Sequence, residues 1–495
     1  MNIQQADANA LRTAILAGEC SVREVTASCL ERIDSHRDLN AFCDVFRAEA
    51  LARAEELDAA LARGDEPGAL FGVPVAIKAN MCLQGQKANC GSRMLENYSP
   101  PYTATFVARL IDAGAVIVGS TNMDEFAMGS SGENSAYGPT LNPWDRDRTP
   151  GGSSSGSAVA VAAGLVPIAL GSDTGGSVRQ PAAMCGIHGF KPTYGRVSRY
   201  GLIAFGSSLD QVSPFARSVR DLELVLEIIS GEDASDSSCL PQPPFERATS
   251  DTGRLDGLKF GVPREYFPDT LDKNIRTHCE AAIEQLIALG AERVDVDLPH
   301  TPHAIPTYYV VATAEASSNL ARYEGVGYGA RTAGDGTLQG MFAATRAASF
   351  GDEVKRRILL GTYVLSAGYS EKWYGKALRV RRLLKNDFDR AFEEVDFIVS
   401  PTSPVTAFKL GERTDDPVAM YLADSLTTPM SLVGLPAIST PCGFIDEAGA
   451  SLPVGLQIVA PQLCDARALY VARVFEQATE HSQARPPASK TGANA

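Results

Sequence analysis

The first 65 residues place apolar side chains at the spacing of helices. Ser21 and Glu24 form an S-x-x-E capping box, the usual start of a helix. Apolar residues follow at helical spacing: Val25, Leu30 and Ile33. A second apolar stripe runs over 46–61 and ends near Gly64. The pattern predicts an N-terminal helical segment, 1–65, that packs on the core.

Beyond residue 65 the pattern changes to short apolar runs bounded by glycine, which are typical of strands buried on both faces. These runs are 71–77, 115–118, 166–170, 258–262, 397–399, 437–440 and 454–459. Helical patterns lie between most of them, for example at 216–230, 273–289 and 372–394. Such alternation predicts an α/β fold with a mostly parallel or mixed sheet.

Two polar stretches limit the packed region. Residues 231–256 are rich in Pro, Ser and Asp and predict a surface excursion. Residues 481–495 have too few apolar side chains to pack, which predicts a disordered tail. The expected main domain is therefore 66–480.

Composition is that of an ordinary globular chain of 495 residues with 44% hydrophobic residues. The net charge of −14 argues against direct binding to nucleic acid or an anionic membrane, so any RNA is expected to be held by a partner. The chain contains no run of 18 apolar residues, so no membrane span is expected, and its start resembles no secretory or transit signal. The ten cysteines show no paired spacing and are expected to be reduced thiols, so we expect a cytoplasmic protein.

Glycine and serine dominate two nearby segments, TPGGSSSGSAVA at 149–160 and GSDTGGSVRQ at 171–180. Each lies beside an apolar stretch, whereas a flexible linker would not be interrupted by the apolar run 159–170. Glycine-rich segments on a rigid scaffold bring backbone N–H groups close to a ligand. We therefore expect the functional site here.

The sequence lacks the motifs of several common phosphate-binding and metal sites. The chain has neither a P-loop nor HExxH, and its six histidines show no metal-ligand spacing, so no metal site is expected. Residues 152–156 match G-x-S-x-G around Ser154, but a proline-rich loop precedes them where a hydrolase elbow needs a strand. A Ser-His-Asp esterase remains an alternative. Lys78 follows the apolar run 73–77 and can act as a base if burial keeps its amine neutral.

Taken together, GVPVAIK (72–78), GGSSSGSA (151–158) and GSDTGGSVRQPAA (171–183) resemble the amidase signature family. The resemblance covers roughly residues 10–480 and implies a large mixed β-sheet covered by helices on both faces, with 66–480 as the catalytic domain. It implies a Ser-cisSer-Lys triad in which Lys78 is the base, Ser153 the bridging serine after a cis peptide, and Ser177 the nucleophile.

The surrounding residues fit acyl transfer by that triad. The backbone amides of Thr174, Gly175 and Gly176 are the expected oxyanion donors, because two glycines let the chain turn inward. Three more residues are expected to support the site: Ser154, Asp173 and Arg179.

Three further stretches, 121–145, 191–211 and 315–329, resemble the A subunits of glutamyl-tRNA(Gln) amidotransferases within that family. This resemblance implies a glutaminase whose glutamine is held by Tyr308, Arg357 and Asp424. It also implies B and C partner subunits: ammonia would pass to B, which would bind ATP, Mg and the tRNA. This chain itself would need no cofactor and would contact tRNA only through B.

The chain departs from the family pattern at Ala79, where an Asp usually follows the base, and in the loop GQKANCGS at 85–92. Losing a carboxylate beside Lys78 would either favour the neutral amine or leave the triad less ordered. A free-standing amidase acting on other carboxamides and a catalytically silent scaffold therefore remain alternatives.

Overall fold

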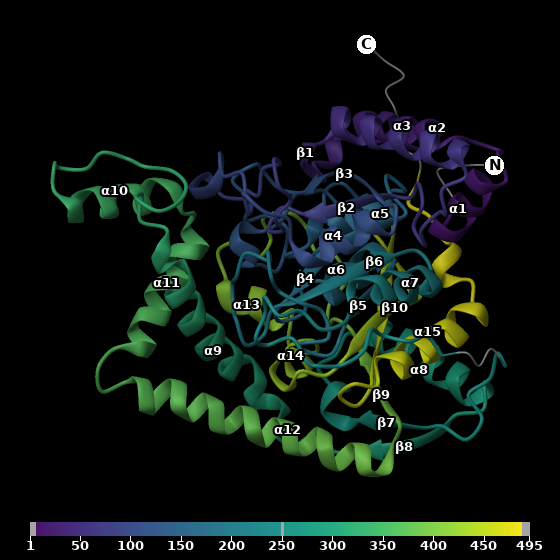
Figure 1. Ribbon diagram of the computed structural model, residues 1–495. Coiled ribbons are helices and arrows are strands. Elements are labelled where there is room, and N and C mark those ends of the chain that lie inside the picture. The colour runs from purple at the N-terminus through teal and green to yellow at the C-terminus, as the bar shows by residue number, and fades with distance from the viewer. Residues whose placement is uncertain (1–5, 249–251, 488–495) are drawn as a thin grey trace.

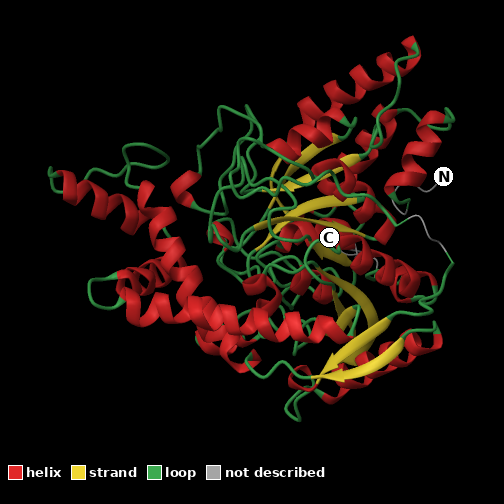
Figure 2. Ribbon diagram, turned by 60° about the horizontal axis from the view of Figure 1, so that its bottom comes forward, coloured by secondary structure: helices red, strands yellow, loops and turns green. Residues whose placement is uncertain are grey.

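A large twisted β-sheet runs through the centre of the molecule, and helices cover both of its faces (Figure 2). The computed structural model describes residues 6–248 and 252–487. The strands are β1 Phe42–Val45, β2 Pro74–Lys78, β3 Val116–Thr121, β4 Ile168–Asp173, β5 His188–Lys191, β6 Gln211–Ala216, β7 Lys259–Pro263, β8 Glu292–Val296, β9 Phe397–Pro401, β10 Ala437–Glu447 and β11 Ala450–Val459.

Within the described residues these strands form one 11-stranded sheet in the order β1-β3-β2-β4-β6-β5-β10-β11-β9-β7-β8. Strands β2, β3 and β4 are parallel to one another, as are β7, β8 and β9. The remaining pairs are antiparallel. The sheet is therefore mixed, which confirms the predicted α/β class.

Around the sheet lie the α-helices, whose places are labelled in Figure 1. They are α1 Ala8–Leu16, α2 Val22–Ser35, α3 Arg47–Arg63, α4 Thr105–Asp112, α5 Ser155–Ala162, α6 Arg179–Cys185, α7 Val219–Ile229, α8 Lys273–Ala288, α9 Ala304–Asn319, α10 Leu338–Ser349, α11 Asp352–Leu365, α12 Lys376–Glu394, α13 Pro417–Leu422, α14 Thr428–Val433 and α15 Asp465–Gln477. None of the helices in the described ranges is long and apolar enough to cross a membrane.

The strand period of two divides the core between the two faces. On β2, Val75 and Ile77 pack in a cluster with α4, α7, α8 and α15, whereas Ala76 faces a second cluster with α2, α5 and α6. Further along the sheet, α9, α12 and α14 cover the face that carries Ile398 and Val459. Apolar side chains cover both faces, which is why the predicted strands appear as continuous apolar runs.

All seven predicted apolar runs contain a strand, and the helices predicted at 216–230 and 273–289 are α7 and α8. The helix predicted at 372–394 is α12, preceded by a π-helical turn at Glu371–Gly375. The capping box of Ser21 and Glu24 is also present at the start of α2.

The all-helical prediction for 1–65 is wrong at one place. Phe42–Val45 forms β1, which pairs antiparallel with β3 at the edge of the sheet. Its four residues are only half-buried and include Asp44, so they lack the apolar run that predicted the inner strands. The N-terminal segment is therefore part of the sheet as well as packed on it.

The two polar stretches differ in how they are placed. Residues 231–248 form no helix or strand in the described part of the excursion, but Phe245 anchors it in the core. In the predicted tail, His481–Gln483 form a 3-10 turn and the His481 ring stacks on Phe475, so this beginning of the tail is packed. Residues 488–495 of that prediction lie outside the described residues.

Helix α5 consists of small residues because backbone passes directly beside it. A Cβ added at Gly156 would lie 2.2 Å from the Ala41 carbonyl oxygen and 2.5 Å from the Asn122 nitrogen. Both neighbours are main-chain atoms that cannot rotate away. The glycine therefore allows α5 to approach the β1–β3 edge closely.

We predict that Gly156→Ala lowers stability by about 1–3 kcal/mol through overpacking, although alanine normally favours a helix over glycine. Gly327→Ala is the matched control, since its nearest neighbour would be the Glu324 side chain at 3.7 Å. Thermal unfolding of both variants measures the difference. An equal or higher melting temperature for Gly156→Ala would contradict the proposed close approach.

Candidate active site

Lys78, the last residue of β2, carries its amine into the interior. Its side chain is fully buried, and burial lowers the pKa of the amine from its usual 10.5 to about 7, although the negative charges of Asp124, Asp173 and Asp210 oppose the shift. At neutral pH a large fraction of this amine is therefore uncharged. An uncharged amine has a lone pair that can accept a proton.

Three serine hydroxyls surround that amine. The Lys78 Nζ lies 2.8 Å from Ser153 Oγ and 2.9 Å from both Ser154 Oγ and Ser172 Oγ. The Ser154 hydroxyl donates to the Ser172 carbonyl, so its oxygen accepts from the amine. Because a neutral amine has two N–H donors and one lone pair, donation to Ser154 and Ser172 leaves the lone pair for the Ser153 proton. The geometry suits proton transfer from Ser153 to Lys78.

The peptide bond between Gly152 and Ser153 is cis, as the family resemblance implies. The Gly152 amide donates to Gln180 Oε1 at 3.0 Å, and the Asp124 amide donates to the Ser153 carbonyl at 3.2 Å. A Cβ at Gly152 would meet Asp124 Oδ2 at 2.1 Å, so glycine is required for this approach. The loop that presents Ser153 is thus held by Gln180 on one side and by the Asp124 backbone on the other.

Ser177 follows β4, in the turn that leads into α6. The Ser154 amide donates to the Ser177 carbonyl at 3.1 Å, so the turn lies directly against the Ser153 loop. The Ser177 hydroxyl makes no hydrogen bond within residues 6–248 and 252–487, and 7% of the residue is exposed. Its oxygen is therefore free to reach a substrate.

The amides of this turn divide into two groups. Those of Thr174, Gly175 and Ser177 have no hydrogen-bond partner in the described chain, which leaves them free to bind a developing oxyanion. The prediction for Gly176 is wrong in this structure, because its amide donates to Asp173 Oδ1 at 2.9 Å. The Asp173 carboxylate caps the start of α6 and so takes that donor.

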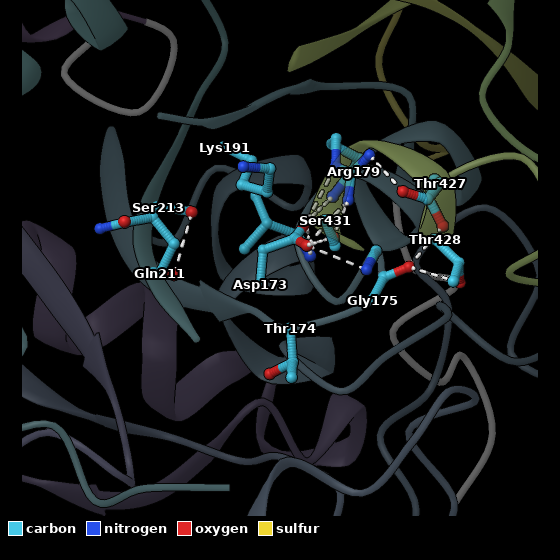
Figure 3. Close-up of polar contacts among 12 residues, drawn as sticks. Asp173, Thr174, Gly175, Arg179, Lys191, Gln211, Ser213, Thr427, Thr428 and Ser431 are labelled. Carbon is cyan, nitrogen blue, oxygen red and sulfur yellow. Dashed lines mark hydrogen bonds and ion pairs between the residues drawn. The ribbon is translucent and has the colours of Figure 1, made fainter. Parts of the chain in front are cut away.

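Asp173 and Arg179 form a fully buried ion pair at 2.9 Å beneath the turn. Burial alone would raise the pKa of Asp173, but the charge and hydrogen bonds of Arg179 hold it below its usual range. Figure 3 shows that Arg179 also reaches the Thr427 carbonyl and the Ser431 hydroxyl. The Arg179 guanidinium therefore ties the nucleophile turn to α14.

The three residues expected to hold a substrate come from separate segments. Tyr308, on α9, packs against Gly175, where a Cβ would lie 2.6 Å from its ring. Arg357, on α11, donates from Nη2 to the Gly129 carbonyl at 2.5 Å. A Cβ added at Gly129 would lie 3.1 Å from the Ser153 nitrogen, so the guanidinium binds a carbonyl close to the triad.

Asp424 lies in the loop between α13 and α14. Thr427 donates from its hydroxyl to the Asp424 carbonyl and to the Gly175 carbonyl, the second of which is drawn in Figure 3. This hydroxyl links the loop to the nucleophile turn. Asp424 is 6% exposed and its Oδ1 has no hydrogen-bond partner in the described chain. Burial raises the pKa of Asp424 to about 8, because the cost of desolvation outweighs the opposing charges of Arg357 and Arg179.

Sequence reasoning missed several residues around the base. Ser172 lies within the recognised segment 171–180, but only the structure shows that its hydroxyl meets the Lys78 amine. Asp124 and Asp210 are buried carboxylates whose pKa values burial raises to about 6. Their only signal in the sequence was their position in polar stretches beside the motifs.

The two departures from the family pattern lie against each other. Ala79 is fully buried and its carbonyl accepts the Cys90 amide at 3.0 Å, from the loop 85–92. Both residues belong to the apolar cluster under α9. The position after the base is therefore dry and uncharged, which suits a neutral amine.

Histidine and metal chemistry find no support in the geometry. Within the described chain no histidine hydrogen-bonds to Ser154 or Ser177, so the G-x-S-x-G match does not build a Ser-His-Asp triad. No group of three or more His, Cys, Asp or Glu in those residues is placed to hold a metal ion. The arrangement suits acyl transfer through Lys78 and two serines.

Comparison with known proteins agrees with this chemistry. The amidase family model matches residues 24–469. The A subunit of glutamyl-tRNA(Gln) amidotransferase from a Synechococcus species is 53% identical, covering 96% of this chain and 98% of that protein. Its counterpart in Carboxydothermus hydrogenoformans is 52% identical over 98% of this chain and 100% of its own length.

A solved structure extends the likeness to three dimensions. The crystal structure of the A subunit of glutamyl-tRNA(Gln) amidotransferase from Thermotoga maritima superposes with a TM-score of 0.78 at 40% identity. The match covers 96% of this chain and 95% of that one. The mixed sheet and its helical layers are thus shared.

We predict that a fluorophosphonate probe labels Ser177 and that Lys78→Met slows labelling by about 10²–10⁴-fold, because the general base is lost. Methionine keeps the volume of the buried side chain. Lys87→Met, at an exposed position, is the control and should label at the normal rate. Peptide mass spectrometry that finds the probe on another serine would reject the triad.

The rate of labelling should rise with pH through a midpoint near 7, since the pKa of Lys78 is about 7 and only the neutral amine accepts a proton. Below that midpoint, the rate should fall about tenfold per pH unit as the amine becomes protonated. A rate that stays constant from acid to alkaline pH would show that Lys78 is not the base.

Proposed function

This chain belongs to the amidase family, and we propose that it is the glutaminase subunit of a glutamyl-tRNA(Gln) amidotransferase. It would hydrolyse glutamine and supply ammonia for the amidation of misacylated Glu-tRNA(Gln). The proposal is supported by the relatives of that name and, above all, by one feature of the site. A buried guanidinium, Arg357, donates to the Gly129 carbonyl near the Ser153 loop. A buried carboxyl whose Oδ1 has no partner in the described chain, Asp424, belongs to the loop that Thr427 joins to the nucleophile turn.

The proposed reaction begins when Ser177 Oγ attacks the side-chain carbonyl carbon of glutamine. Ser153 takes the Ser177 proton and passes its own to neutral Lys78. The free amides of Thr174, Gly175 and Ser177 are the donors available to stabilise the oxyanion, a contribution of about 3–4 kcal/mol for one such donor. The C–N bond then breaks, the proton on Lys78 returns through Ser153 to the leaving nitrogen, and ammonia departs. Water releases glutamate from Ser177 by the same relay.

Selection of a free amino-acid amide follows from charge. The Arg357 guanidinium would bind the α-carboxylate and the Asp424 carboxylate the α-ammonium, while Tyr308 packs beside them. The raised pKa of Asp424, about 8, is consistent with this role, because an incoming ammonium would favour the ionised form. A plain alkyl amide would leave the remaining donors of Arg357 and the Oδ1 of Asp424 unused.

Further subunits belong to the proposal. A B subunit would bind ATP, Mg and the tRNA, receive the ammonia and amidate the glutamate, and a small C subunit would join the two. The net charge of −14 fits a chain that leaves RNA contact to its partner. We propose that the complex acts in the cytoplasm and that this chain binds no cofactor of its own.

We predict that the chain copurifies with two further subunits and that this complex hydrolyses glutamine. Arg357→Ala should raise the KM for glutamine more than it lowers kcat, because it removes a binding contact and leaves the relay intact. Ammonia release under varied glutamine concentration measures both constants. An unchanged KM would show that the carboxylate binds elsewhere.

The rival function, a free-standing amidase of the same family, predicts a different substrate range. Glutamine, asparagine and a simple aryl amide should be offered to the same preparation. Turnover of the aryl amide alone, with no copurifying subunit, would overturn the glutaminase proposal. Loss of all turnover in Ser177→Ala assigns whatever activity is found to this site.

A further inference from the structure

Helix α11 carries a second charged residue one turn before Arg357. Glu353 Oε1 accepts a hydrogen bond from Arg357 Nε at 2.7 Å, and the pair is nearly buried, with side-chain exposures of 12% and 3%. A buried guanidinium needs a fixed acceptor, since it would otherwise turn to any nearby carbonyl. Glu353 therefore determines how the Arg357 plane is oriented.

Only two of the donors of Arg357 are used within the described chain. A guanidinium has five N–H groups, of which Nε binds Glu353 and one on Nη2 binds the Gly129 carbonyl. Three N–H groups, two on Nη1 and one on Nη2, have no partner in the described chain. Nη1 and Nη2 therefore keep donors for a carboxylate, which a guanidinium binds with charge-assisted hydrogen bonds.

Glu353 also contacts the segment that carries Asp424. Arg357 and Asp424 together form the proposed amino-acid clamp. The Tyr421 hydroxyl, from α13, donates to the same Glu353 Oε1 at 2.8 Å. The Tyr421 ring stacks on Tyr309 at 3.8 Å between centroids, and the Arg357 guanidinium lies over both rings at 5.4 and 5.3 Å. The Asp424 amide donates to the Tyr421 carbonyl, so this tyrosine is directly coupled to Asp424.

One carboxylate oxygen thus joins the two halves of the amino-acid clamp. On α11 it orients Arg357, and through Tyr421 it holds the segment that carries Asp424. Glutamine presents its α-carboxylate and α-ammonium at a fixed separation, so the clamp must keep Arg357 and Asp424 at a matching separation. Neither group touches the reacting amide, so the effect should fall on substrate choice.

Resting on the proposed glutaminase function, we propose that Glu353 and Tyr421 are positioning residues that make the site specific for amides bearing an α-carboxylate. Glu353 touches no substrate atom in this scheme. It acts by fixing the plane of the Arg357 guanidinium, and with it the remaining Nη donors, and by fixing the distance to Asp424. The chemistry at Ser177 is independent of both residues.

The test compares glutamine with butanamide, which is glutamine without its α-carboxylate and its α-ammonium. Glu353→Ala should raise the KM for glutamine roughly tenfold or more, because a hydrogen bond to a charged group is lost. Tyr421→Phe, which keeps the stacked ring, should raise it about threefold or more. Neither variant should change kcat/KM for butanamide, which uses neither half of the clamp, so the preference for glutamine should shrink.

Two further variants separate position from charge. Glu353→Gln retains an acceptor for Arg357 Nε and should recover most of the glutamine preference. Asp352→Ala removes one carboxylate from the same turn of α11, at a side chain 95% exposed, and should leave both substrates unaffected. Probe labelling of Ser177 at the normal rate identifies variants whose fold and relay are intact.

The outcomes distinguish a failure of this positioning role from a failure of the proposed glutaminase function. If the wild-type complex turns over no glutamine, the proposed function fails. The positioning role is wrong if the wild-type complex turns over glutamine but Glu353→Ala and Tyr421→Phe leave the KM for glutamine unchanged. It is also wrong if these variants lower the turnover of both amides equally. A selective loss with glutamine alone, restored in Glu353→Gln, supports it.

Discussion

Removal of one amine from water is the condition on which this active site depends. Lys78 ends a strand that is buried on both faces, so its side chain cannot reach solvent as most lysines do. Desolvation makes the charged form costly, and three buried carboxylates are close enough to limit the shift without reversing it. The sheet that builds the core is therefore also what makes the base usable near neutral pH.

A second constraint fixes the positions of the separate segments of the active site relative to one another. The nucleophile turn after β4, the Ser153 loop before α5 and the loop before α14 are joined by the Asp173–Arg179 pair, Gln180 and Thr427. Each link is buried and holds one of these segments against another. Such links keep the reacting groups in position before a substrate arrives, which is what makes electrostatic stabilisation effective.

The sequence predicted the parts of this structure that have a strong local signal, such as the continuous apolar runs of β2 and β4 and the long motif segments. Strands β6 and β8 were missed, because β6 contains polar residues and a proline, whereas β8, at the edge, alternates charged residues with valine. In the site, spacing identified Lys78 but not its contact with Ser172 or the loss of the Gly176 amide to a carboxylate. Nor could Glu353 be found, because such a glutamate beside a helical arginine is ordinarily an exposed surface pair. These roles arise from contacts between distant segments, which no local pattern encodes.

The origin of the clamp has a consequence for how such enzymes diversify. The relay is built on the central sheet and on α5 and α6, but Tyr308 and Arg357 come from α9 and α11, which lie to one side of that sheet (Figure 1). Exchange of those outlying helices would present a new surface to the same reacting atoms. Inheritance of the hydrolytic machinery and acquisition of a new ligand preference are thus separable events in a fold of this kind.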